Sequence, residues 1–175
     1  MPDLRQLTSR FPLPGRVEAI LLRPTRGAPM LAVPSVVALQ HRGLEGDRSA
    51  ASPATQAGGH KRQVTLIQAE HLPLIAAWIG RASVSPAQLR RNLVIAGLNL
   101  VAGRALFADQ SIRITIGADV VLLATGPCDP CSKMEVELGM GAYNAMRGHG
   151  GITALVLVGG RIAVGDEVRL SCGAG

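Results

Sequence analysis

Short apolar runs separated by glycine and proline turns recur along the whole chain. Residues 112–116 (Ile-Arg-Ile-Thr-Ile) alternate strictly between apolar and polar, the pattern of a strand with one buried face. Further strand candidates, rich in Val, Ile and Leu, are residues 17–23, 32–39, 63–67, 93–95, 120–125, 152–158 and 162–170. Pro34 interrupts the candidate strand at residues 32–39 and favours an edge position or a late start for it. Gly165-Asp166 predicts a kink in the last.

Helical patterns are fewer. Residues 68–79 carry apolar side chains at helical spacing, with Pro73 close enough to the start to be tolerated. Ser85-Pro86 predicts a capped single turn, whereas Gly139 and Gly141 weaken a helix over residues 135–147. We find no parallel βαβ alternation. The pattern therefore predicts a mainly β fold, a closed antiparallel or mixed barrel with a few peripheral helices.

The chain has 175 residues, 47% hydrophobic and 17% charged, which excludes a disordered chain. Because only 2% are aromatic, the core must be aliphatic. We expect one domain over residues 15–172, preceded by a flexible leader over residues 1–14. The N-terminus lacks the apolar core of a signal peptide and no apolar run reaches about 18 residues. We therefore expect a cytoplasmic protein without membrane contact.

The net charge is +6, and basic residues cluster at Arg23/Arg26, His60-Lys61-Arg62 and Arg90-Arg91. Such a balance favours an anionic partner. Nucleic acid is disfavoured because side chains that stack on bases are nearly absent. A small phosphorylated ligand fits better.

Several basic residues stand where they could surround such a ligand. Arg48 belongs to a glycine-bracketed turn, either in an ion pair with Asp47 or over a pocket. Residues 49–59 are small and polar and lead into Lys61 and Arg62, an arrangement typical of a lid over an anion.

Further candidates follow later in the chain. Arg90, Arg91 and Asn92 stand at the mouth of a buried strand, where arginine suits phosphate and asparagine suits the edge of a heterocycle. Arg147 and His149 add basic side chains to a glycine-rich turn.

The turn of residues 125–135 holds Cys128 and Cys131 just before a predicted helix. A helix N-terminus and the nearby Lys133 favour a thiolate, which binds soft metals or attacks electrophiles. A structural zinc site needs a second ligand pair, which the sequence lacks, and the thioredoxin-like unit around a dithiol redox motif is absent. Two interpretations of this turn stay open. In the first, a thiolate binds a soft metal that is carried by an anionic organic ligand. In the second, the two thiols only pack in a tight turn.

The order of these motifs resembles a known family. Residues 46–48 (Gly-Asp-Arg), 61–67 (Lys-Arg-Gln-Val-Thr-Leu-Ile), 90–97 (Arg-Arg-Asn-Leu-Val-Ile-Ala-Gly), 130–131 (Pro-Cys), 150–151 (Gly-Gly) and 165–166 (Gly-Asp) are similar to the MOSC domain. This domain forms the C-terminal module of molybdenum cofactor sulfurases and also occurs as small bacterial proteins. The resemblance covers residues 15–170.

The resemblance implies a barrel that binds the pterin-based molybdenum cofactor, molybdopterin, with Cys131 as the ligand of molybdenum. Arg48, Arg90 and Asn92 match positions that hold the pterin and its phosphate in amidoxime-reducing relatives, and Arg23 falls where those relatives carry a lysine. The serine-rich segment of those relatives reads Gln-Ala-Glu-His at residues 68–71 here. Cys128 is not a general family feature, so a resolving thiol, a second metal ligand and packing remain alternatives for it.

Stand-alone relatives are oxidoreductases that reduce N-hydroxylated compounds with electrons from separate proteins. We therefore expect a small N-hydroxylated substrate and a flavin or iron–sulfur reductase as electron donor. The alternative is a sulfur carrier, with persulfide on Cys131 supplied by a pyridoxal phosphate-dependent cysteine desulfurase.

Overall fold

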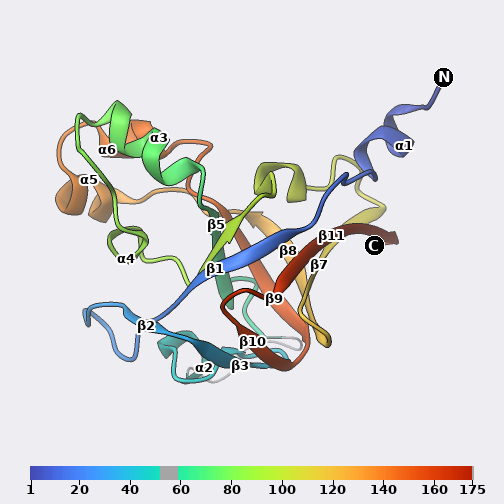
Figure 1. Ribbon diagram of the computed structural model, residues 1–175, viewed down its shortest axis with the longest axis horizontal. Coiled ribbons are helices and arrows are strands. Elements are labelled where there is room, and N and C mark those ends of the chain that lie inside the picture. The colour runs from blue at the N-terminus through green and yellow to red at the C-terminus, as the bar shows by residue number, and fades with distance from the viewer. Residues whose placement is uncertain (52–58, 175) are drawn as a thin grey trace.

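Seven strands close into a mixed β-barrel, as the sequence predicts (Figure 1). The structure is a computed structural model that describes residues 1–51 and 59–174. The barrel strands run in the order β11-β7-β8-β9-β5-β6-β1, and pairing between β1 and β11 closes it. They are β1 (Gly15–Leu22), β5 (Val64–Gln68), β6 (Leu93–Ala96), β7 (Gln110–Ile116), β8 (Val120–Pro127), β9 (Ile152–Val158) and β11 (Glu167–Ala174).

Two predicted strands each divide between two sheets. Residues 32–39 separate at Pro34 into β2 (Leu31–Val33), an edge strand on β1, and β3 (Ser35–Leu39). The prediction of one kinked strand over residues 162–170 is wrong, because Gly165 has a φ of +94° and turns the chain from β10 (Gly160–Ala163) into β11. A second sheet holds β10, β3 and β4 (Gly43–Leu44). These turns place the second sheet at one end of the barrel (Figure 1).

One pair of neighbouring barrel strands is parallel. β5 and β6 pair in parallel, with Leu66 opposite Leu93, and the chain between them forms α3 (His71–Trp78) and α4 (Pro86–Leu89). The sequence-based prediction that the fold contains no parallel βαβ unit is therefore wrong. A parallel pair needs a crossover of a dozen or more residues, and the short helices α3 and α4 supply it.

Helices cover one side of the barrel and create a second core. The barrel interior is aliphatic, as predicted, with fully buried residues such as Leu66, Ile114 and Leu122. Outside it, Ile67 and Val94 of the parallel pair pack against α3, α4, α5 (Ser132–Leu138) and α6 (Ala142–Met146) (Figure 1). β5 and β6 are thus buried on both faces, which explains their unbroken apolar sequences.

Three short helices complete the described chain: α1 (Leu4–Thr8), α2 (Arg48–Ala51) and the 3₁₀ helix η1 (Leu100–Gly103). α1 belongs to the segment predicted as a leader, and its Arg5 forms an ion pair with Asp109 at 2.9 Å. Most of the predicted lid, residues 52–58, lies outside the described residues. Within the described chain, no helix has the length and apolarity needed to cross a membrane.

Candidate functional site

A pocket of about 390 Å³ lies where several chain segments meet beside the cysteine loop, residues 125–131. Its cationic lining comes from the end of β1, the start of α2, the approach to β5, the α4–β6 connection and α5. The charged residues that line it are Arg23, Arg48, Arg62, Arg90, Arg91, Lys133, Asp47 and Asp129. Six cations therefore face two carboxylates, and the pocket is strongly cationic.

Two of these arginines have buried nitrogen atoms without a partner. The Nε atoms of Arg23 and Arg90 are both buried and make no hydrogen bond in the described structure. A buried unsatisfied donor costs about 1–3 kcal/mol. Burial lowers the pKa of Arg23, and the neighbouring Arg90 lowers it further, while Asp47 opposes both effects. An anion in the pocket that both side chains line would relieve this repulsion.

The backbone fixes the direction of Arg90. Ser85 caps α4 by accepting a hydrogen bond from the Ala87 amide, and Pro86 occupies the first turn, as the sequence predicts. Arg90 ends the helix in the left-handed conformation, with a φ of 56°. A non-glycine residue pays about 1–2 kcal/mol for that conformation. The turn separates the directions of Arg90 and Arg91, so that the two side chains have different surroundings.

Asp47 is the buried centre of the network beneath the pocket. Its carboxylate accepts hydrogen bonds from the Arg23 amide at 2.8 Å, from the Ser49 amide at 2.9 Å and hydroxyl at 2.7 Å, and from Asn92 Nδ2 at 3.1 Å. Asp47 therefore holds β1, α2 and β6 in register around the pocket and offsets part of its positive charge.

Asn92 completes this network from the other side. Its Nδ2 also donates to the Leu21 carbonyl at 3.2 Å, and its Oδ1 accepts from the amide and the hydroxyl of Thr65. Both donors and both acceptor positions of the side-chain amide are thus occupied by the protein. Asn92 lines the pocket and ties β1, β5 and β6 together at its floor.

Arg91 holds the cysteine loop in place. Its side chain is buried and donates to the backbone carbonyls of Gly150 at 2.7 Å, Leu89 at 2.7 Å and Cys128 at 3.1 Å. The loop approaches so closely that a Cβ on Gly150 would lie 2.3 Å from the Cys128 carbonyl oxygen. Arg91 and the glycine-rich turn therefore dock the thiols against the pocket.

The two thiols of the loop differ in accessibility. Cys131 is exposed, lines the pocket and is the N-cap residue of α5. Cys128 is buried, and Arg62 Nη2 donates to its Sγ at 3.1 Å. Burial raises the pKa of Cys128, although Arg91 and Arg62 oppose the shift. Cys131 is thus the thiol that a bound group in the pocket can reach.

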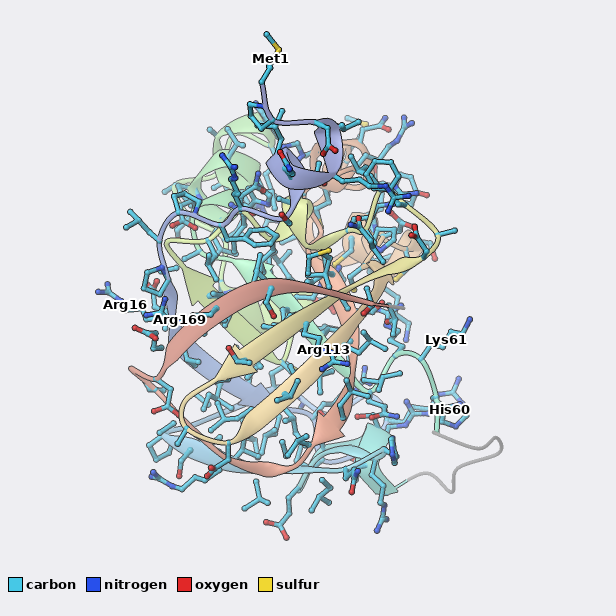
Figure 2. The ribbon with its side chains drawn as sticks, turned by 90° about the vertical axis from the view of Figure 1, so that its right-hand side faces the viewer. Met1, Arg16, His60, Lys61, Arg113 and Arg169 are labelled. Carbon is cyan, nitrogen blue, oxygen red and sulfur yellow. The ribbon has the colours of Figure 1, made fainter. Side chains whose placement is uncertain are left out.

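The structure brings most of the predicted site residues together. Seven line the pocket, and Cys128 lies behind it; the seven are Arg23, Arg48, Arg62, Arg90, Arg91, Asn92 and Cys131. Lys61 and Arg147 are exposed and do not line it. Figure 2 shows Lys61 pointing away from the barrel. Among the described residues, no three His, Cys, Asp or Glu side chains are grouped so as to hold a metal ion.

Sequence reasoning missed the central role of Asp47. The residue was expected only as a surface partner of Arg48, because the Gly-Asp-Arg sequence is typical of an exposed turn. Lys133, expected only to act on the thiols, also lines the pocket. A signal for Asp47 exists in its position two residues before Ser49, since an Asp side chain in a turn can accept a hydrogen bond from the backbone two residues on, and here it accepts from both the amide and the hydroxyl of Ser49.

Taken together, the chain is a small mixed β-barrel protein with an arginine-lined pocket that an exposed cysteine shares. The family model of the MOSC domain matches residues 53–169. The chain therefore belongs to the MOSC domain family, named after the C-terminal domain of molybdenum cofactor sulfurases.

Solved structures show the same fold. The YuaD protein of Bacillus subtilis is 20% identical, with a TM-score of 0.76 over 90% of this chain and 96% of its own. YiiM of Geobacillus stearothermophilus is 19% identical, with a TM-score of 0.66 over 90% of this chain and 75% of its own. YiiM of Escherichia coli is also 19% identical, with a TM-score of 0.59 over 89% and 69%. No curated protein matches the sequence.

Proposed function

We propose that this protein binds the pterin-based molybdenum cofactor in the arginine-lined pocket. One observation carries the proposal: the exposed thiol of Cys131 shares a pocket with six cationic side chains, Arg23 and Arg90 among them. A phosphate on the ligand matches the guanidinium groups, and a soft metal matches the thiolate. The residues present therefore fit an anionic organic ligand that carries a metal.

Each residue has a distinct part in this arrangement. Arg23 and Arg90 would bind the phosphate, and the Cys131 thiolate would bind molybdenum. Asp47 and Asn92 keep their strands in place, because their hydrogen bonds are directed to the protein. Since the described residues offer no cluster of protein ligands, the remaining metal ligands would come from the pterin itself.

We further propose that the protein is a reductase of N-hydroxylated small molecules. The bound cofactor supplies two-electron chemistry at its metal, while the protein supplies binding and orientation. The pocket opens to solvent beside Cys131, so a substrate and an electron-donor protein can both approach the same place. A flavin or iron–sulfur reductase would act as the donor.

Turnover under defined conditions tests the reductase. Protein produced in cells that make the cofactor is assayed anaerobically with an N-hydroxylated purine and a chemical electron donor. Cys131→Ser should abolish turnover, whereas Cys172→Ser, at the free cysteine of β11, should keep it. Equal turnover in the wild type and Cys131→Ser would refute a role for this thiol.

A second candidate function is sulfur transfer, which the exposure of Cys131 also favours. A desulfurase persulfide would pass its outer sulfur to the Cys131 thiolate and keep its own cysteine as a thiol. Incubation with a pyridoxal phosphate-dependent desulfurase and cysteine, followed by mass spectrometry, would then show a gain of one sulfur on Cys131. A molybdenum-loaded protein with turnover and without such a gain would favour the reductase.

A further inference from the structure

A smaller pocket of about 170 Å³ adjoins the arginine-lined pocket. The two share Arg48, Ser49, Arg62 and Gln63, and the side pocket adds His41, Arg42, Gly59 and His60. Ligand sites for whole small molecules usually enclose about 300–1,000 Å³. The side pocket is thus sized for one group of a molecule whose remainder extends into the main pocket.

The side pocket is cationic. Arg42, Arg48 and Arg62 bring three guanidinium groups to it, and no carboxylate is among the described residues that line it. Residues 52–58 contain no Asp or Glu either. Three guanidinium groups exceed the single charge of a carboxylate and suit a phosphate ester, which carries close to two charges and several acceptor oxygens.

The described backbone holds this pocket in shape. His41 adopts a left-handed conformation with a φ of 58°. The chain at Gly59 passes so close to His41 that a Cβ on Gly59 would lie 2.2 Å from the His41 carbonyl oxygen. Arg42 Nη2 donates to the Ala50 carbonyl at 2.9 Å, and the other side-chain donors of Arg42 have no partner among the described residues. Arg42 is therefore held at the pocket by a hydrogen bond that uses only its Nη2 atom among the described contacts.

Arg62 connects the side pocket to the cysteine loop. It lines both pockets, and its Nη2 lies 3.1 Å from Cys128 Sγ. A molecule with its anionic group in the side pocket would therefore extend past Arg62 into the main pocket, which Cys131 lines. That is the arrangement a substrate needs if the reacting end and the charged end bind at different places.

We propose that the side pocket binds the phosphate of a phosphorylated N-hydroxylated substrate, such as a nucleotide with an N-hydroxylated base. The inference rests on the proposed reductase function and specifies its substrate class. Phosphate esters should then be better substrates than the corresponding uncharged compounds. Among the arginines of the side pocket, Arg42 separates the two sites, because it lines the side pocket and not the main one.

The test compares N⁶-hydroxyadenosine monophosphate with its nucleoside in the molybdenum-loaded protein. The wild type should show a higher kcat/KM for the nucleotide. Arg42→Ala should lower kcat/KM for the nucleotide on the order of 10- to 100-fold, as expected for lost charge-assisted hydrogen bonds. In the same variant, kcat/KM for the nucleoside should stay within about twofold of the wild-type value. Arg161→Ala, an exposed arginine of β10, should change neither. Equal kcat/KM for both compounds in the wild type would overturn the proposal.

Two further measurements separate the failure of this inference from the failure of the proposed function. Molybdenum content should be the same in Arg42→Ala and the wild type, and its loss would assign the side pocket to the cofactor instead. Equilibrium binding of adenosine monophosphate, with adenosine as reference, needs no turnover. Weaker nucleotide binding in Arg42→Ala would support the side pocket even in a protein without reductase activity. Inorganic phosphate should compete, and competition by acetate alone would contradict a phosphate site.

Discussion

Replacing Arg90 with alanine should have opposite effects on folding and on anion binding. In the absence of an anion, Arg90 has a buried Nε without a partner, a like-charged neighbour in Arg23 and one long hydrogen bond of 3.5 Å to the Ala28 carbonyl. Removing an unsatisfied buried donor is worth about 1–3 kcal/mol, and losing the weak bond and the packed stem offsets about 1 kcal/mol. We therefore expect the free energy of unfolding to rise by about 1 kcal/mol.

Anion binding should weaken in the same variant. A guanidinium contact to phosphate contributes about 1.5–3 kcal/mol, or roughly 10- to 150-fold in affinity. Urea unfolding at increasing inorganic phosphate measures both effects, because a ligand of the folded state raises its stability by an amount that grows with the logarithm of its affinity and concentration. Arg161→Ala is the control for loss of an arginine elsewhere. A loss of more than about 1 kcal/mol in phosphate-free buffer would show that Arg90 is a structural residue and refute this reasoning.

Three other predictions concern the support of the site. Gly151→Ala should lower the free energy of unfolding by more than about 2 kcal/mol, because the φ of Gly151 is +89° and the new Cβ would lie 1.9 Å from the Leu66 carbonyl oxygen. The control is Gly148→Ala, which has a φ of +76° but open space around the new Cβ, and it should cost only about 1 kcal/mol. Arg91→Met should cost about 3 kcal/mol or more in urea unfolding, since three carbonyls lose their donor, and an unchanged midpoint would contradict its docking role. Burial raises the pKa of Cys128, so the folded protein retains that proton longer than the unfolded chain; stability should fall above about pH 8.5, and a Cys128→Ala variant with the same fall would exclude this thiol as the cause.

The sequence predicts the barrel well where a strand's own residues determine its environment. The alternation at residues 112–116 corresponds to β7, whose side chains are alternately buried and more exposed. The apolar runs at residues 63–67 and 93–95 correspond to strands buried on both faces. Their parallel pairing could not be predicted, because it depends on how the intervening helices pack against the barrel. The change of sheet at Gly165 is likewise decided by distant partners.

In the site, as in the barrel, the sequence predicts what local residues determine and misses what long-range contacts determine. Cations near strand ends were expected to converge, and Arg23, Arg62 and Arg90 do line one pocket. Lys61 stays outside it because it lies in a bend before β5, and the path of that bend depends on long-range contacts such as the hydrogen bond from the Thr125 hydroxyl to the Lys61 carbonyl. Asp47 was missed as a buried centre because its four donors come from residues that are distant in the sequence or were expected in a loop.

Elemental analysis tests the central claim most directly. The protein is purified from cells that make the molybdenum cofactor, and molybdenum and zinc are measured beside Cys131→Ser and Cys172→Ser. We expect molybdenum near one atom per chain in the wild type and in Cys172→Ser, and its loss in a folded Cys131→Ser variant. A folded wild-type protein without molybdenum, or with equal molybdenum in all three proteins, would contradict binding through Cys131.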